Sequence, residues 1–235
     1  MSLFIGQVQN DKALLSPAES HHMTRVLRMK IGDQIFVTDG NGAMFKGKFE
    51  SLEGKMAIIG DLESLENNQK RPYTMEMAVA PTKQIDRLEF FLEKAIEIGL
   101  DTYYPIITFN SERRKLNHER LEKIAISAMK QSLKAEQPIV RNLQSFSNFL
   151  KSQKDTRGQK YIAHCHDDIE SVNIKDIITP NANYQFMIGP EGDFSKEEVL
   201  MAKDFGYQPI SLGNQRMRTE TAALSCVMLT HWLHL

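Results

Sequence analysis

The alternation of short apolar runs with amphipathic helical patterns beyond residue 70 is the feature that most restricts the fold of this 235-residue chain. The apolar runs read MEMAVAP, YYPIITF, KYIAHC, YQFMIG and QPISLG. The helical patterns between them include QIDRLEFFLEKAIEIGL, which ends at Gly99, and a long helix within NHERLEKIAISAMKQSLKAEQ that stops before Pro138. Such alternation needs right-handed crossovers and gives a mostly parallel sheet with helices on both faces. The predicted fold class is therefore α/β, with ligands bound at the carboxyl ends of the strands.

The first 70 residues have a different pattern, which predicts a separate small domain. Ser16, Pro17 and Glu19 predict the start of a short helix, with a capping box between Ser16 and Glu19. From Gly32 to Leu62, three β-type runs are separated by turn-forming residues: QIFVTD, AMFKGKFE and KMAIIGDL. This arrangement is typical of a small β-barrel or a curled sheet.

A polar segment, SLENNQKRPY at 64–73, has no apolar periodicity and predicts a linker between the two parts. We place the boundary near residue 70. The predicted domains are residues 1–70 and residues 71–235.

The charge balance limits the ways in which the chain could bind nucleic acid. The net charge is -1, and binding by counterion release needs a sustained positive surface. If RNA is a ligand, local basic clusters must therefore carry the binding. The candidate clusters are Arg25, Arg28 and Lys30; Arg113, Arg114 and Lys115; and Lys130, Lys134 and Arg141.

No apolar stretch approaches the roughly 20 residues that span a bilayer, and MSLFIGQVQNDK lacks the basic start and long apolar run of a signal peptide. We therefore expect a cytoplasmic protein with no membrane partner.

Metal binding and disulfide formation are not expected. Cys165 and Cys226 are far apart and have no zinc-ligand spacing, so both are interpreted as buried, reduced thiols. A metal hydrolase is an alternative because potential ligands follow one strand: His164, His166, Asp167, Asp168 and Glu170. These residues lack a third ligand at a recognisable spacing, which favours an ordinary strand end.

An unusual turn follows the strand YQFMI. The chain continues Gly189-Pro190-Glu191-Gly192-Asp193-Phe194, and Ser195 then caps a helix in a capping box with Glu198. The glycines allow close approach of a ligand, but the acidic first turn of the helix is unsuited to a pyrophosphate. A phosphate-free adenosine cofactor fits better. S-adenosylmethionine is such a ligand, because its sulfonium cation would tolerate a carboxylate such as Glu191.

A second unusual turn follows the strand in ISLGNQRMR. It leads through Leu212-Gly213 into TETAALSCVMLTHWLHL, a helix that is apolar on most of its circumference. We expect this helix to be buried in a core or against a second subunit. Spacing alone leaves open that both turns are tight strand-to-helix connections without ligands.

The same segments resemble the RsmE family of bacterial 16S ribosomal RNA uridine-N3 methyltransferases, in the SPOUT superfamily. The paired signatures are Ile188-Gly189-Pro190-Glu191-Gly192, Leu212-Gly213 and Arg218-Thr219-Glu220-Thr221-Ala222-Ala223. His22–Arg28 with Gly32-Asp33 resemble the N-terminal PUA-like domain of the family, and Glu93–Gly99 resemble its first catalytic-domain helix.

The resemblance implies a SPOUT-type α/β domain with a deep C-terminal trefoil knot, preceded by a small PUA-like β-barrel domain that binds RNA. It implies S-adenosylmethionine-dependent methylation of uridine N3 in 16S ribosomal RNA, within the small ribosomal subunit. It also implies a homodimer with the active site near the subunit interface.

The resemblance further implies the site residues. The cofactor would lie between two groups of residues: Ile188, Gly189, Glu191 and Gly192 in one, and Leu212, Gly213, Met217, Arg218 and Thr221 in the other. Arg218 is the catalytic candidate that contacts the base or its phosphate. Glu220 orients that arginine, serves as a base or is a structural cap. The RNA-binding candidates are Arg25, Arg28, Lys30 and Lys134.

Three positions depart from the family pattern. Asp193 stands where a second glycine is usual, Gln215-Arg216 replaces a common arginine-isoleucine pair, and Lys134 occupies a usual arginine position. Lysine cannot reproduce the bidentate contact of arginine with phosphate. The competing hypothesis is a non-catalytic RNA-binding protein with a vestigial methyltransferase fold, which cofactor affinity would distinguish.

Overall fold

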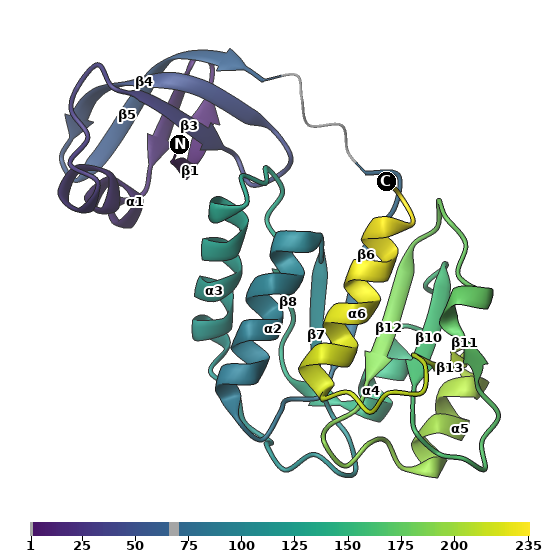
Figure 1. Cartoon of the computed structure of the whole chain (residues 1–235). Helices are drawn as coiled ribbons and strands as arrows, with labels where there is room; N and C mark the ends of the chain where they lie inside the picture. The colour runs from purple at the N-terminus through teal and green to yellow at the C-terminus, as the bar shows by residue number, and fades with distance from the viewer. Residues whose placement is uncertain (1, 66–70) are drawn as a thin grey trace. The chain divides into compact units, whose positions relative to one another are not determined.

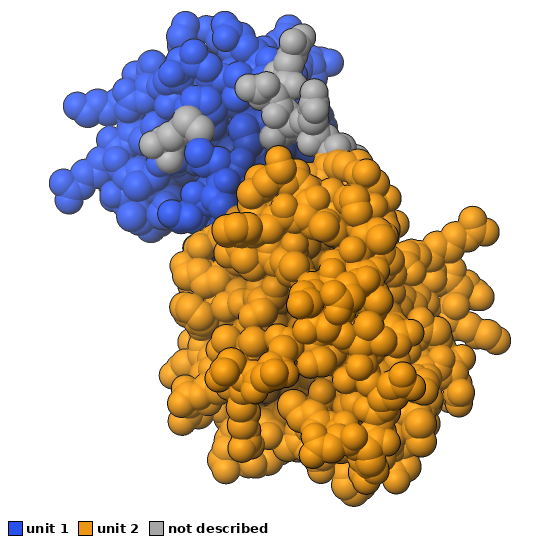
Figure 2. Space-filling view, turned by 45° about the vertical axis from the view of Figure 1, so that its right-hand side comes forward, with its two compact units in different colours: residues 1–70, 126–137 blue, residues 71–125, 138–235 orange. Residues whose placement is uncertain are grey.

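The computed structural model describes residues 2–65 and 71–235 and divides the chain into two compact units (Figure 2). The first unit contains Met1–Lys70 and Ile126–Gln137, and the second contains Arg71–Ala125 and Pro138–Leu235. Of the predicted linker at 64–73, residues 66–70 lie outside the described residues.

The first unit is built around a closed five-stranded barrel with the strand order β1-β2-β5-β4-β3. Its strands are β1 (Leu3–Gln9), β2 (Lys12–Leu15), β3 (Gln34–Thr38), β4 (Met44–Glu53) and β5 (Met56–Ser64). Parallel pairing of β1 with β3 closes the barrel around Phe4, Leu15, Ile35 and Ile59. The predicted barrel is confirmed, but only β3, β4 and β5 were expected from the sequence.

The short helix after Ser16 forms, although its predicted capping box is wrong. Helix α1 (Pro17–His21) continues into the π-helix η1 (His22–Val26), and Ser16 Oγ accepts a hydrogen bond from Glu19 N at 3.2 Å. The Glu19 carboxylate does not return to Ser16. It accepts from Ile5 N at 3.3 Å and from Lys130 Nζ at 2.8 Å. Lys130, one of the candidate RNA contacts, is therefore engaged inside this unit.

Residues 126–137 are attached to the barrel by specific hydrogen bonds. They include the last turns of α3 (His118–Gln131) and the segment that follows. Thr38 Oγ1 donates to Ala135 O at 2.6 Å, and Gln137 N donates to Gly40 O at 2.9 Å. Some of the contacts that stabilise the barrel therefore come from a segment far along the chain.

The second unit has a parallel sheet whose main path runs β11-β13-β10-β12-β6-β7-β8. The long strands are β6 (Met75–Val79), β7 (Thr102–Ile107), β10 (Gln159–Ala163), β12 (Tyr184–Ile188) and β13 (Gln208–Ser211). Two-residue strands add to it: β8 (Ile139–Val140), β9 (Gln144–Ser145), which pairs with β7, and β11 (Val172–Asn173). The five long strands confirm the five apolar runs of the sequence.

Helices cover both faces of this sheet, as predicted. Helices α2 (Ile85–Ile98) and α6 (Thr219–Trp232) lie side by side over one face (Figure 1). Helices α4 (Phe146–Ser152) and α5 (Lys196–Asp204) cover the other, where Phe149 and Val199 pack with Ile162 and Met187. A short 3₁₀ helix, η2 (Ile174–Asp176), follows β11. No helix within the described residues is long and apolar enough to cross a membrane.

A buried polar cluster joins β6 and β12 within the sheet. Gln185 Nε2 donates to Glu76 Oε2 at 2.6 Å and to Gln153 Oε1 at 3.0 Å, and Tyr207 OH donates to Gln185 Oε1. Burial raises the pKa of the Glu76 carboxyl above its ordinary value. The cluster lies near the amino ends of these strands, because Glu76 and Gln185 are each the second residue of their strand.

One expectation about burial is wrong, and another stays a prediction. Helix α6 is buried along Ala223, Cys226 and Val227, but Met228 and Trp232 on its outer side are 40% and 69% exposed. The sequence predicts burial in a core or against a second subunit; one side of α6 lies in the core of this chain, and burial of the other side against a second subunit stays a prediction. Both cysteines are free, as predicted, yet Cys165 is exposed because it follows β10 at the edge of the sheet.

Candidate functional site

Three neighbouring strands bring their carboxyl ends together at one edge of the sheet. Ala163 of β10 is paired with Ile188 of β12 on one side and with Ile210 of β13 on the other. The segments that follow these strands therefore begin next to one another. Both turns singled out in the sequence lie at this edge, where ligands of parallel sheets bind.

The first turn (residues 189–194), which we call the cofactor loop after the role that the sequence predicts for it, is tightly packed at Gly189. A Cβ atom on Gly189 would lie 3.0 Å from Phe194 N and 3.1 Å from Asp193 C. Gly189 O accepts a hydrogen bond from Thr219 Oγ1 at 3.0 Å, and Ile188 O accepts from Ala80 N at 3.0 Å. The loop is thereby attached to the start of α6.

Asp193 adopts a conformation that explains why glycine is usual there. Its φ is 63°, in the left-handed region that favours glycine. Its carboxylate accepts from Cys165 N through Oδ2 and from Phe194 N through Oδ1, both at 2.7 Å. These bonds connect the cofactor loop with the end of β10. They also offset the energetic cost of placing a residue with a side chain in this left-handed conformation.

The helix after the cofactor loop has the predicted capping box. Ser195 Oγ accepts from Glu198 N at 3.2 Å, and Glu198 Oε2 accepts from Ser195 N at 2.9 Å. The other oxygen of Glu198 accepts from Phe109 N at 2.8 Å. One carboxylate therefore caps α5 and holds the loop that follows β7.

Two more contacts fix the cofactor loop from neighbouring loops. Asn110 Nδ2 donates to Gly192 O at 2.9 Å and to Asp193 O at 3.1 Å. Glu191 Oε1 accepts from Lys83 N at 2.9 Å. The sequence did not identify Asn110 or Lys83, because their proximity depends on β6 pairing with β12 and on β7 pairing with β6.

The second turn, residues 211–218, begins at the end of β13, at the same edge of the sheet. Gly213 has φ 107° and donates from its backbone N to Ser211 Oγ at 3.2 Å. Leu212 and Met217 are partly buried, and Met217 Sδ accepts from Ser225 Oγ at 3.6 Å. Thr221 is exposed in the first turn of α6.

Arg218 and Glu220 have different surroundings at the start of α6. Arg218 is the exposed N-cap residue. The Glu220 side chain is only 11% exposed and lies 3.8 Å from Arg87 Nε of α2. Among the described residues, no hydrogen bond or ion pair joins Glu220 to Arg218, so Arg87 is the guanidinium that Glu220 faces.

His164, directly after β10, has an unsatisfied ring nitrogen. Its Nδ1 accepts from His166 N at 3.2 Å, which places the proton of the neutral ring on Nε2. That Nε2 is buried without a hydrogen-bond partner in the described part of the chain, and burial is the main cause that lowers the pKa of His164. The described residues contain no group of three or more His, Cys, Asp or Glu side chains that could hold a metal ion.

Three of the predicted RNA-binding residues lie on one exposed segment of the first unit. Arg25 lies in the last turn of η1, Arg28 has φ 56°, and Lys30 donates from its backbone N to Asp33 Oδ2 at 2.8 Å. All three residues are at least partly exposed. Lys134 belongs to the segment 126–137 of this unit and is partly buried.

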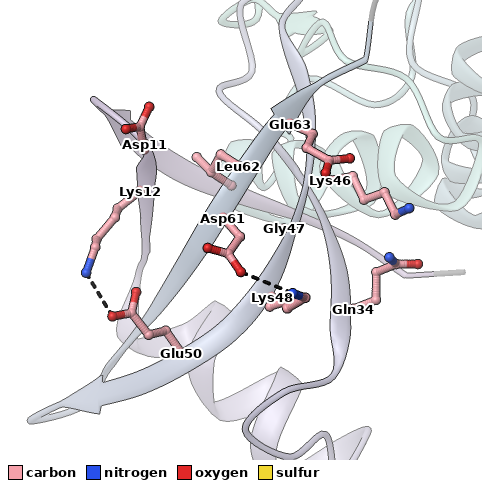
Figure 3. Close-up of a pocket in the computed structure, with 10 residues that line it drawn as sticks. All are labelled: Asp11, Lys12, Gln34, Lys46, Gly47, Lys48, Glu50, Asp61, Leu62 and Glu63. Atoms are coloured by element: carbon pink, nitrogen blue, oxygen red, sulfur yellow. Dashed lines mark hydrogen bonds and ion pairs between the residues drawn. The ribbon is translucent and has the colours of Figure 1, made fainter.

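The barrel also has an open groove between strands (Figure 3), but its charge is mixed. Lys12 pairs with Glu50 at 2.9 Å and Lys48 pairs with Asp61 at 3.1 Å. Lysines and carboxylates alternate along the groove, so it does not supply the positive surface that RNA phosphates need.

Two family models match the chain. The model of an RNA methyltransferase domain matches residues 69–231, and that of an RNA methyltransferase PUA domain matches residues 15–62. The chain is also similar to the ribosomal RNA small subunit methyltransferase E of Rickettsia conorii. The two are 29% identical over 218 residues, which cover 91% of this chain and 86% of that protein.

Solved structures resemble the whole chain. A protein from Porphyromonas gingivalis, described as a probable rRNA-methyltransferase, has a TM-score of 0.82 and 37% identity and covers 99% of this chain and 98% of its own. The ribosomal RNA small subunit methyltransferase E of Neisseria gonorrhoeae, bound to S-adenosyl methionine, has a TM-score of 0.87 and 25% identity over 99% and 98% of the two chains.

Proposed function

This chain belongs to the RsmE family of RNA methyltransferases, and on that premise we propose that it methylates N3 of a uridine in 16S ribosomal RNA. It is an enzyme that methylates ribosomal RNA with S-adenosylmethionine as the methyl donor. The observation that carries the proposal is the convergence of the cofactor loop and the turn at 211–218 on one edge of the sheet, through the shared partner strand β10.

The chemistry of this edge fits S-adenosylmethionine. The first turn of α5 holds Glu197 and Glu198, and hydrogen bonds from the backbone and from Ser195 lower the pKa of Glu197, which keeps it charged. A positive sulfonium is compatible with that charge, whereas a pyrophosphate is not. We propose that Ile188, Gly189, Glu191 and Gly192 contact one side of the cofactor. Leu212, Gly213, Met217, Arg218 and Thr221 contact the other.

The reaction also requires that the uracil lose its N3 proton and that the resulting negative charge be stabilised. The cofactor supplies an electrophilic methyl group, and uridine N3 must lose its proton to accept it. Arg218 is exposed, permanently charged and placed where the second turn meets α6. We therefore assign it to contact the base or its phosphate and to stabilise negative charge on the uracil oxygens. Glu220 is paired with Arg87, which favours a positioning role at the start of α6.

The remaining parts of the proposal concern the partners and the topology. Arg25, Arg28, Lys30 and Lys134 would contact RNA phosphates, which position an enzyme without reading sequence. The substrate would be 16S RNA within the small ribosomal subunit, in the cytoplasm. A trefoil knot around the cofactor loop, and a homodimer formed through the exposed side of α6, complete the proposal. Met228 and Trp232 on that side support the dimer.

A methylation assay tests the proposed function. Purified protein would receive labelled S-adenosylmethionine with naked 16S RNA or with small subunits that lack the modification, followed by nucleoside mass spectrometry. We expect N3-methyluridine, and turnover about a hundredfold lower for Arg218→Ala, because loss of one charge-stabilising donor has effects of this order. Cofactor affinity, measured by calorimetry, should fall much less than turnover.

Two outcomes would contradict the proposal. Absence of N3-methyluridine from both RNA substrates would exclude the uridine-N3 activity. Absence of cofactor binding by the wild type would favour a non-catalytic RNA-binding protein.

A further inference from the structure

Phe109 is displayed at the tip of a rigid turn that follows β7. Ser111 N donates to Thr108 O at 3.2 Å, and Thr108 N donates to Ser111 Oγ at 2.9 Å, so the two residues close the turn. Both are buried, whereas the Phe109 side chain between them is 75% exposed. The turn therefore holds the backbone of Phe109 and leaves its ring in solvent.

The same turn is fixed to the cofactor loop and to the helix that follows it. Phe109 N donates to Glu198 Oε1 at 2.8 Å, and the side chain of Asn110 donates to Gly192 O at 2.9 Å. A Cβ on Gly192 would lie 3.0 Å from Asn110 Cβ, which shows how closely the two loops pack. The position of Phe109 is thus set relative to the loop that we assign to the cofactor.

Cationic residues follow this turn along the chain. The guanidinium of Arg114 is exposed and donates to Phe109 O at 3.4 Å, and Lys115 next to it is exposed. Arg113 has another role, because it donates to Thr82 O at 3.1 Å and to Lys83 O at 2.7 Å and so joins two loops. Arg114 and Lys115 lie just after this turn and are exposed, so they can contact a partner.

We propose that Phe109 is a stacking platform for a base of the RNA substrate beside the cofactor loop, with Arg114 and Lys115 as contacts for the adjacent phosphates. Unpaired bases stack on exposed aromatic rings, and neighbouring cations bind the backbone. The turn fixes the backbone of Phe109 in advance, so less conformational entropy is lost on binding. This inference rests on the proposed function, because it takes RNA as the substrate.

Substitution of the ring tests the proposal in the full-length protein. For Phe109→Ala we expect the Kd for a single-stranded fragment of 16S RNA to rise about 5- to 150-fold, the range found for the loss of one base–aromatic stack. The Kd for S-adenosylmethionine and the melting temperature should not change. Phe90→Ala is the matched control, because Phe90 on α2 is 50% exposed and is not part of the turn.

A spectroscopic variant separates stacking from a structural role. The chain has one tryptophan, Trp232, so Phe109→Trp adds a single reporter whose fluorescence is compared with that of the wild type. The variant should keep RNA affinity, and its added fluorescence should be quenched when RNA binds. Quenching of the wild-type Trp232 signal gives the background.

Three results would overturn the proposal. The first is an unchanged RNA affinity for Phe109→Ala or an unquenched Phe109→Trp. The second is an equal loss of S-adenosylmethionine affinity, which would place Phe109 in the cofactor site. The third is a change in oligomeric mass, which would mean that a second copy covers the ring.

RNA binding is measured without turnover. A wild type that fails to methylate RNA would therefore contradict the proposed function, while the comparison of RNA affinities would still decide the role of Phe109.

Discussion

Backbone conformation at single residues decides which side chains the cofactor loop accepts. Gly189 is packed against the backbone of Asp193 and Phe194, so an added Cβ would make tight contacts of 3.0 Å and 3.1 Å there. Asp193 occupies a left-handed conformation and offsets its cost with two hydrogen bonds from backbone N–H groups. The loop therefore has one position where glycine avoids a tight contact and one where a polar residue adopts the conformation that favours glycine.

Gly189→Val should abolish cofactor binding without unfolding the protein. The added atoms would push against Phe194 N and Asp193 C, and overpacking of this kind costs about 1–3 kcal/mol. Calorimetry with S-adenosylmethionine should show no binding, while the circular dichroism spectrum stays that of the wild type. Leu200→Ala on α5, where the side chain is 52% exposed, is the control. Wild-type affinity in Gly189→Val would remove Gly189 from the site.

The sequence identified both turns of the candidate site but not their supports. The glycines and the capping box of 189–198 are local signals, and the structure has them as expected. The backbone of Cys165, the side chain of Asn110 and the backbone of Lys83 contact the first turn only because β10, β6 and β7 have particular neighbours in the sheet. Strand order is a non-local property, and no pattern around those three residues encodes it.

At the scale of the sheet, the pairing of β6 with β12 places a carboxyl group in a buried polar cluster. Gln185 joins Glu76 to Gln153 and Tyr207. Folding transfers Glu76 from water to this interior, which disfavours its charged form and raises its pKa above 4.5. The carboxyl group therefore binds its proton more tightly in the folded state than in the unfolded one.

The free energy of unfolding of the second unit should therefore depend on pH through the proton bound by Glu76. Because the folded pKa of Glu76 is raised, its favourable contribution is fully present below pH 4.5 and is lost as the pH rises through the folded pKa. The free energy of unfolding of the wild type, relative to that of Glu76→Gln, should therefore fall with increasing pH. The slope is at most about 1.4 kcal/mol per pH unit for one proton.

Urea titrations of both proteins between pH 4 and pH 8 would measure this difference. The amide oxygen introduced by Glu76→Gln can still accept the hydrogen bond from Gln185, so packing is preserved. A difference that is constant over the range would show that Glu76 does not change its proton affinity on folding.

Long elements were predicted more completely than short ones. Five apolar runs became five strands, and Gly99 ends α2 with φ 151°. The strands β8, β9 and β11 have two residues each, too few to show any periodicity. The strand β1 was not expected, and its role depends on parallel pairing with β3, about 30 residues away.

At the scale of the whole molecule, the exposed side of α6 predicts self-association. Trp232 and Met228 are 69% and 40% exposed on a helix whose other side is buried. Trp232→Glu should shift the protein from dimer to monomer in sedimentation velocity, because an interface core excludes an unpaired charge. Leu200→Glu introduces the same charge on α5 and should leave the dimer intact. A wild type that sediments as a monomer at micromolar concentration would contradict the predicted dimer.

The attachment of residues 126–137 to the barrel has a consequence for protein synthesis. The hydrogen bonds of Thr38 and Gly40, and the ion pair of Glu19, all have partners in that later segment. During translation the barrel strands leave the ribosome more than sixty residues before these partners do. The barrel therefore completes its native contacts only after most of α3 has been made, so the nascent chain carries an unfinished first unit while the second begins to form.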